Sequence, residues 1–145
     1  MPVRPRRAFS LPELVVVATV VALAAAVAGP RTGAALDRIR LRQAAGEVAE
    51  ALAVGRTTAI AQSAYVRVVV DEALSVVRVE ADTQTLHRRD LSALHHVTLR
   101  ATRDTVTYAP TGLGWGLANT TIVVARGARA ESVTVSRLGR VRTSW

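Results

Sequence analysis

The sequence has 145 residues, enough for one domain, and half of them are apolar, so it can bury a modest hydrophobic core. It contains no cysteine, which excludes disulfide bonds, thiolate metal sites and a cysteine nucleophile. The formal net charge is +8, and arginine supplies all 19 of the strongly basic residues, a composition that suits a nucleic acid or an anionic surface as partner.

The first predicted element is an apolar run from Phe9 to Gly29, in which only Ser10, Glu13 and Thr19 are polar. A helix of this length spans about 31 Å, the thickness of the hydrocarbon core of a membrane. Arginines precede the run and Arg31 follows it. By the positive-inside rule we expect a single-pass membrane protein with a cytoplasmic N-terminus and a periplasmic or otherwise extracytoplasmic C-terminal domain.

A removable secretory signal explains some of the same features, because Ala26-Val27-Ala28 has the small residues of a cleavage site. Glu13 argues against it, since a carboxylate at mid-membrane costs up to roughly 3 kcal/mol and a disposable signal gains nothing from that cost. The run also leads through Pro30 directly into a second helical pattern. These features favour a retained membrane helix and leave the secretory signal as the alternative.

The segment from Arg6 to Leu14, RRAFSLPEL, resembles the class III signal of type IV prepilins and type II secretion pseudopilins. The resemblance implies a leader of residues 1–8 that an inner-membrane prepilin peptidase cuts between Ala8 and Phe9, followed by N-methylation of Phe9. The family usually has glycine where Ala8 stands. It also implies that Glu13, the fifth residue of the mature chain, pairs with the N-terminal amine of an adjacent pilin during assembly.

The next stretch, residues 30–64, is predicted to continue the helix in amphipathic form. Its apolar positions are spaced alternately four and three residues apart, as expected for one face of a helix that packs on a sheet. These positions are Leu41, Ala45, Val48, Leu52, Gly55 and Ala59. Arg40, Gln43, Glu47 and Glu50 lie roughly opposite, so the two segments together predict one helix of about fifty residues.

From residue 65 to residue 145 the pattern changes to short β-branched runs, which predict an extracytoplasmic domain made mainly of β-sheet. The predicted strands are 65–70, 74–80, 97–101, 105–108, 121–125 and 132–136. Residues 71–73 are short enough for a hairpin turn. Residues 110–116 are rich in glycine, but they lack the strand-then-helix context and the Gly-Lys-Ser/Thr ending of a phosphate-binding loop, so turn chemistry explains them better.

Residues 108–112, 133–136 and 138–142 resemble the GspH/FimT group of minor pilins and pseudopilins, with the Gly-Arg-Val-Arg of residues 139–142 as the most telling part. The resemblance implies an α+β fold, in which one long N-terminal helix packs on a C-terminal antiparallel β-sheet domain. It also implies a place at or near the tip of a type IV pilus or of the pseudopilus of a type II secretion system.

The sequence offers little for catalysis or metal binding. His95 and His96 are consecutive in a strand-like run, so we expect them to face opposite sides, and His87 stands alone. The acidic residues form no close pair with an evident pocket motif. We therefore expect no enzyme activity, no metal and no cofactor.

The C-terminal region carries five arginines against one acidic residue, Glu131. These are Arg126, Arg129, Arg137, Arg140 and Arg142. Some FimT-like relatives bind DNA through the matching arginine motif, so DNA uptake is the alternative to a purely structural filament role. Arginines that alternate along an edge strand and discourage aggregation are the competing interpretation. Because aromatic residues are few, we expect any DNA binding to be directed at the backbone and blind to sequence.

Overall fold

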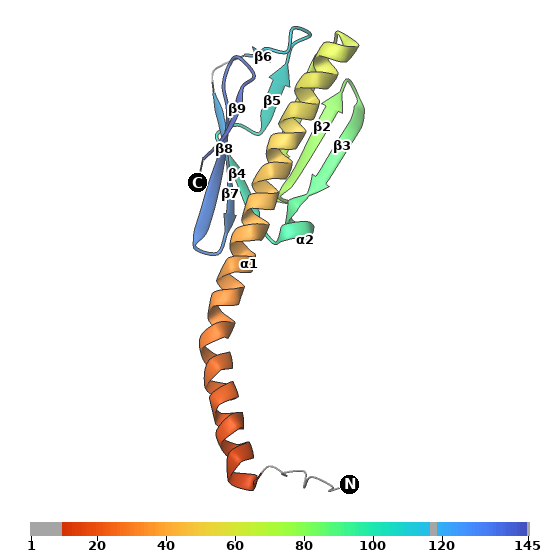
Figure 1. Ribbon diagram of the computed structural model, residues 1–145. Coiled ribbons are helices and arrows are strands. Elements are labelled where there is room, and N and C mark those ends of the chain that lie inside the picture. The colour runs from red at the N-terminus through yellow and green to blue at the C-terminus, as the bar shows by residue number, and fades with distance from the viewer. Residues whose placement is uncertain (1–9, 117–118, 145) are drawn as a thin grey trace, which may run out of the picture. The chain divides into compact units, whose positions relative to one another are not determined.

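The computed structural model describes residues 10–116 and 119–144, except for the side chains of residues 27–32. The chain divides into two compact units, residues 1–36 and 37–145. One helix, α1 (Leu11–Gln62), begins in the first unit and continues into the second (Figure 1). The prediction of a long N-terminal helix ahead of antiparallel β-sheets is confirmed.

In the first unit, α1 starts after Ser10, and its first turn contains Pro12, where the missing backbone N–H has no intrahelical acceptor to lose. Every side chain described from residue 10 to residue 26 is exposed. Among the described residues, no helical stretch is long and apolar enough to cross a membrane. The predicted span 9–29 includes Phe9 and the side chains of residues 27–29, which lie outside the described residues, so the span stays a prediction.

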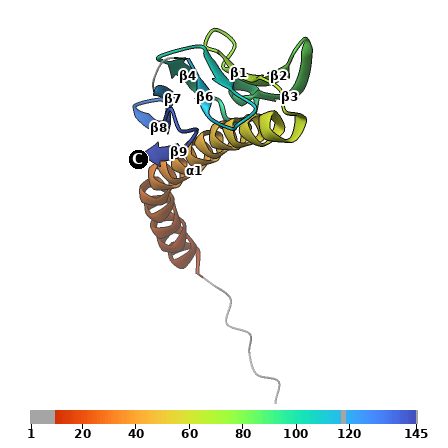
Figure 2. The same ribbon diagram turned by 90° about the horizontal axis from the view of Figure 1, so that it is seen from above.

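In the second unit, the apolar stripe predicted for α1 is confirmed. All six predicted positions are buried, together with Ala44 and Ala51, which widen the stripe. Arg40, Gln43 and Glu50 are exposed on the other side of the helix. This part of α1 lies along the sheets of its unit (Figures 1 and 2).

The strands form two antiparallel sheets. The first has the order β3-β2-β1-β5-β6, with β1 (Val66–Asp71), β2 (Val76–Ala81), β3 (Gln84–Asp90), β5 (Thr105–Tyr108) and β6 (Gly114–Trp115). The second has the order β4-β7-β8-β9, with β4 (Thr98–Ala101), β7 (Thr120–Arg126), β8 (Arg129–Val135) and β9 (Val141–Ser144). A short helix, α2 (Leu91–His95), connects β3 to β4.

Alternating side chains from both sheets meet the helix in one hydrophobic core. Val66, Val68 and Val70 of β1 are buried, and Ile122 and Val124 of β7 are buried in the same cluster. The helix approaches β1 closely at Gly55, where an added Cβ would lie 2.5 Å from Cγ2 of Val68. Glycine at this position therefore sets how closely α1 and the first sheet can pack.

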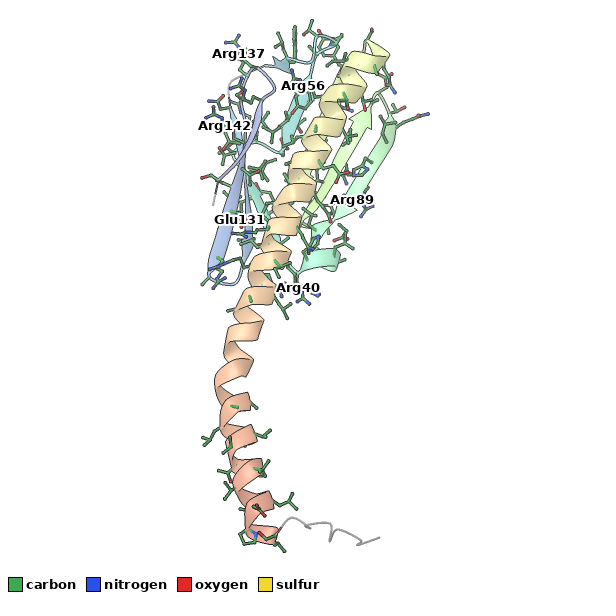
Figure 3. All side chains as sticks on the ribbon, viewed as in Figure 1. Arg40, Arg56, Arg89, Glu131, Arg137 and Arg142 are labelled. Carbon is green, nitrogen blue, oxygen red and sulfur yellow. The ribbon has the colours of Figure 1, made fainter. Side chains whose placement is uncertain are left out.

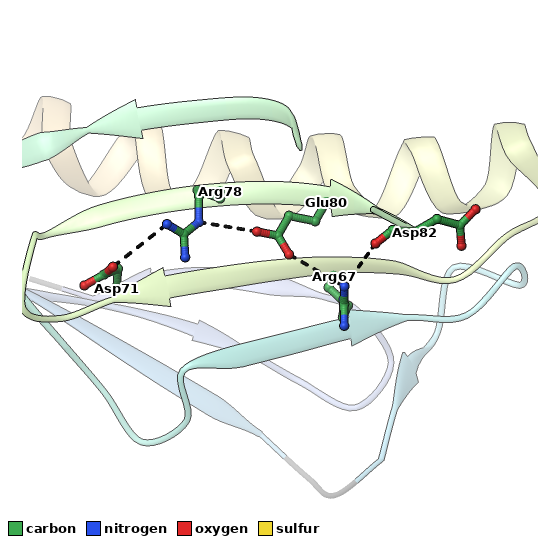
Figure 4. A network of polar contacts seen from close by, with 5 residues as sticks. All are labelled: Arg67, Asp71, Arg78, Glu80 and Asp82. Atoms are coloured by element: carbon green, nitrogen blue, oxygen red, sulfur yellow. Dashed lines mark hydrogen bonds and ion pairs between the residues drawn. The ribbon is translucent and has the colours of Figure 1, made fainter. Parts of the chain in front are cut away.

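The outer side of β1 and β2 carries a chain of ion pairs (Figure 4). Arg78 lies 3.3 Å from Glu80 and 3.9 Å from Asp71, and Arg67 lies 3.7 Å from Glu80. Arg67 also donates to the backbone carbonyl of Asp82 at 3.1 Å. These arginines are therefore neutralised by carboxylates on their own sheet.

Three strands and one helix were not predicted, namely β3, β6, β9 and α2. The expectation that His95 and His96 lie in a strand is wrong, because His95 ends α2 and His96 is its left-handed C-cap, with φ of 53°. Asp90 caps this helix by accepting from the backbone N–H of Ala93 at 2.9 Å, which lowers the pKa of the Asp90 carboxyl. His95 instead contacts Glu47 of α1, with 2.8 Å between Nε2 and Oε1.

Candidate functional site

The start of α1 places Glu13 in the first helical turn. Its Oε2 accepts from the backbone N–H of Ser10 at 3.2 Å and from the Ser10 hydroxyl at 3.1 Å. A carboxylate in this position also interacts favourably with the positive end of the helix dipole. The predicted processing site, Ala8 and Phe9, lies outside the described residues.

Large apolar side chains surround Glu13 on the same helix and are 54–79% exposed. These side chains are Leu11, Leu14, Val15, Val16, Val17, Val20, Val21 and Leu23. They are consecutive or nearly so and therefore point in all directions around the helix axis. No amphipathic stripe distinguishes one side, in contrast to the second half of α1.

The five C-terminal arginines do not form one group. Arg126 ends β7 and Arg129 begins β8, across a tight turn, while Arg137 and Arg140 lie in the β8–β9 connection. At about 3.3 Å per residue, the length of β8 separates these two ends by about 20 Å. Only Arg142, on β9, lies on an edge strand. The five arginines therefore do not alternate along one edge strand, and this interpretation of them is wrong.

Arg126 is occupied by contacts within its own unit and is 17% exposed. Its Nε donates to Oδ1 of Asp37 on α1 at 2.8 Å. Its Nη1 donates to the carbonyl oxygens of His95 and His96 at the end of α2. The contact with Arg126 lowers the pKa of the Asp37 carboxyl. Arg126 therefore ties α1, α2 and β7 together.

Arg137, Arg140 and Arg142 lie at the other end of β8, and all three are exposed. In Figure 3, Arg137 and Arg142 lie toward the end of the unit at which α1 ends, whereas Arg40 lies toward the other end. Arg140 and Arg142 line a surface cavity of about 360 Å³ together with Thr134 and Ser136. Within the described part of the chain, none of the three guanidinium groups forms an ion pair.

The connection that holds these arginines is a closed turn. The Ser136 N–H donates to the Arg140 carbonyl at 2.9 Å, and the Gly139 N–H donates to the Ser136 carbonyl at 2.8 Å. The Gly114 N–H donates to the carbonyl of Arg137 at 3.0 Å, which joins this turn to the first residue of β6. A Cβ on Gly139 would lie 2.7 Å from the carbonyl oxygen of Gly112, so residues 108–112 and 138–142, two of the segments that resemble the GspH/FimT group, are in direct contact.

Sequence reasoning missed an aromatic pair beside these arginines. The rings of Tyr65 and Trp115 meet edge to face, with centroids 5.2 Å apart and planes at 73°. The strand register brings them together, because Thr107 of β5 lies opposite both Arg67 of β1 and Trp115 of β6. No local sequence signal joins residues fifty positions apart, and β6 is too short to show a strand pattern.

No protein-family model matches the sequence, and no curated protein matches it by sequence. Among solved structures, the chain is similar to the type IV minor pilin FimU of Pseudomonas aeruginosa in two crystal forms. In space group P65 the TM-score is 0.60 at 15% identity, over 72% of this chain and 92% of FimU. In space group P21 the TM-score is 0.62 at 16% identity, over 74% and 90%. The chain therefore has a type IV pilin-like fold.

Proposed function

We propose that this chain is a minor subunit of a pilin-like filament, belonging to a type II secretion system or a type IV pilus. Before assembly, its N-terminal helix would hold it in the inner membrane, with the β-sheet domain outside the cytoplasm. The observation that carries the proposal is the apolar start of α1, exposed all around, in a chain with a type IV pilin-like fold. The GspH/FimT group is the subfamily we propose, on the sequence resemblance alone.

An apolar helix surface of this extent needs a cover, because exposed patches of this kind mark membrane or protein contacts. Covering the exposed part of each large side chain with lipid or with neighbouring helices would contribute about 1 kcal/mol or more per residue. Lipid would cover the helix before assembly. The helices of other pilins would replace the lipid inside a filament.

Glu13 gives this helix a means of choosing its partner and register. Cleavage before Phe9 would create a positive amine one residue from Ser10, whose N–H and hydroxyl both donate to Glu13. A carboxylate in hydrocarbon requires a partner, and the N-terminal amine of an adjacent subunit supplies a charge of the right sign. We propose that this pairing guides assembly after a prepilin peptidase has cut and N-methylated the chain.

The test is to express the full chain with a prepilin peptidase in bacterial membranes and determine the mature N-terminus by intact mass and peptide sequencing. The expected product begins at N-methylated Phe9, and cells without the peptidase should leave the chain uncut. A terminus after Ala28 in either strain would identify a secretory signal and remove the role proposed for Glu13.

The assembly step has its own matched pair of variants. Glu13→Gln should be cut normally but fail to enter sheared filaments, because the amide cannot neutralise the amine of a neighbour. Ser10→Ala, which removes only the hydroxyl donor to the carboxylate, should assemble as the wild type does. Normal incorporation of Glu13→Gln would show that the pairing does not guide assembly.

A second proposed function is DNA binding through Arg137, Arg140 and Arg142, which would serve DNA uptake. All three are exposed, Arg140 and Arg142 line one cavity, and Arg137 lines a neighbouring cavity that shares Leu138 with it. Among the described residues, no carboxylate forms an ion pair with any of the three. Three phosphate contacts predict that log affinity for duplex DNA falls by about 2.7 per log unit of salt. Replacing all three by alanine should abolish this slope, and a wild-type chain that shows no salt-dependent binding would exclude the function.

A further inference from the structure

The Tyr65–Trp115 pair offers flat aromatic surface to solvent. Trp115 is 63% exposed and Tyr65 is 48% exposed. The two side chains line a surface cavity of about 580 Å³ together with Thr107, Arg67 and Asp82. An aromatic pair in the core would be covered by apolar neighbours, whereas this pair borders an open hollow.

A second hollow, of about 490 Å³, continues from the same two rings toward Arg137 and Leu138. Leu138 also borders the cavity of Arg140 and Arg142, so the three hollows adjoin one another through shared residues. Among the described residues, the part that runs from Trp115 to Arg142 is lined by three arginines and no acidic residue. Positive charge therefore begins immediately beside the aromatic rings.

We propose that this surface, defined by Tyr65, Trp115, Arg137, Arg140 and Arg142, binds a single-stranded nucleic acid. One or two bases stack on Trp115 and Tyr65, and the adjacent phosphates lie against the arginines. A single strand exposes both bases and phosphates, which match the aromatic rings and the arginines of this surface. A duplex keeps its bases stacked on one another and exposes only its phosphates to such a surface. The inference rests on the proposed DNA-binding function and adds to it a preference for unpaired strands.

The kind of ligand is indicated by the aromatic rings and the positive charge that lie on the same surface. Another filament subunit would also cover exposed Leu113, Leu138 and Trp115, but it would have to bring carboxylates to three arginines grouped on one side. A polyanion with planar aromatic groups at regular intervals matches both features at once. DNA and RNA share this chemistry, so both belong in the test.

The experiment uses the full chain in detergent with Trp145→Phe, which leaves Trp115 as the only tryptophan. The probes are a 20-residue oligo-dT, the matching oligo-U, a 20-base-pair duplex and inorganic polyphosphate, a polyanion without bases. Single strands should quench the fluorescence of Trp115, and polyphosphate should compete for the arginines without quenching. A difference between oligo-dT and oligo-U identifies which sugar the site accepts.

Two variants separate stacking from apolar contact. Because both lack Trp115, their affinities are measured by the fluorescence anisotropy of 5′-labelled oligonucleotides. Trp115→Leu keeps an apolar side chain and should weaken single-strand binding about tenfold, with less than twofold change for the duplex. Trp115→Phe should restore most of the loss. Leu94→Ala, on α2 and 57% exposed, lies outside these hollows and should leave both affinities unchanged.

The outcomes distinguish this inference from the function on which it rests. If alanine at all three arginines abolishes binding of every probe but Trp115→Leu weakens strand and duplex equally, the arginines bind DNA and the stacking site does not exist. If the arginine variant binds as the wild type does, the DNA-binding function itself fails. If no oligonucleotide changes the fluorescence of Trp115 in the Trp145→Phe protein, the inference is wrong and another filament subunit is the better occupant of this surface.

Discussion

Replacing Arg126 by alanine should destabilise the β-sheet unit without weakening any DNA binding. Arg126 is the C-terminal arginine whose guanidinium joins three elements, through Asp37 of α1 and through the two carbonyl groups that end α2. The last carbonyl groups of a helix have no partner within it, so a cation at this end replaces missing hydrogen bonds and also interacts with the helix dipole.

The expected loss is about 2 kcal/mol. Hydrogen bonds from a charged donor contribute about 1.5–3 kcal/mol each, but water can reach the freed carbonyl groups and Asp37 is half-exposed, so the lower part of the range applies. For a unit of this size that corresponds to a fall of roughly 8 °C in melting temperature. Arg142→Ala, an exposed position on an edge strand, should change stability by less than about 0.5 kcal/mol.

The loss should depend on pH in a defined direction. Because the contact with Arg126 holds the pKa of Asp37 below its usual 3.8, the ion pair contributes fully above that value and is lost as pH falls through the lowered pKa. Wild type and Arg126→Ala should therefore differ by a constant amount near neutral pH and converge partly in acid, down to the difference that the contacts with the two carbonyl groups contribute. In the Arg142→Ala control no such convergence is expected.

Thermal denaturation followed by circular dichroism at several pH values, together with DNA titration of the folded proteins, provides the measurement. The expected pattern is reciprocal: Arg126→Ala loses stability and keeps DNA affinity, whereas Arg142→Ala keeps stability and loses affinity. If Arg126→Ala melts with the wild type, or weakens DNA binding as much as Arg142→Ala does, the division of the arginines into two groups is wrong.

Two further predictions concern the core of the same unit. Gly55→Ala should lower the free energy of unfolding by about 1–3 kcal/mol in chemical denaturation, because its Cβ would lie 2.5 Å from the stiff side chain of buried Val68. The control Gly46→Ala, whose Cβ would have no atom within 4 Å, should stabilise by up to about 1 kcal/mol. Equal effects at both positions would contradict the packing argument. Tyr108→Phe should be neutral or slightly stabilising, since the buried hydroxyl has no partner among the described residues. Burial raises the pKa of Tyr108 to about 12, so wild-type stability should decline from pH 10 to 12 more steeply than that of the variant. Parallel stability curves for the two proteins would contradict this pH dependence.

Periodic patterns were sufficient to predict the long helix and most strands, because those elements bury one regular face. The missed elements lack such a face. β3 is an edge strand whose residues Gln84–Leu86 are all exposed, so its sequence shows no alternation. β6 has only two residues, and α2 depends on the cap at Asp90 rather than on periodicity. Their existence follows from pairing and capping with distant parts of the chain.

The arginines illustrate a different limit of sequence reasoning. Counting charges near the C-terminus groups Arg126 with Arg142, although one is occupied by Asp37 and the other faces solvent. Which arginine meets a carboxylate depends on strand register and on where α1 passes, and neither is encoded locally. The same holds for Tyr65 and Trp115, which sequence reasoning counted among scattered aromatics and which β5 brings into contact.

The glycines of the two contacting loops explain how the exposed charges are held in place. Gly112 and Gly139 both have positive φ, at 75° and 73°, and a Cβ on Gly139 would lie 2.7 Å from the carbonyl oxygen of Gly112. Backbone therefore packs directly on backbone here, and the side chains of Arg137 and Arg140 remain outside. A binding surface whose backbone is already fixed loses less conformational entropy when a ligand orders it. The sequence predicted these glycines only as turn residues, but they also fix the backbone that carries the proposed nucleic-acid surface.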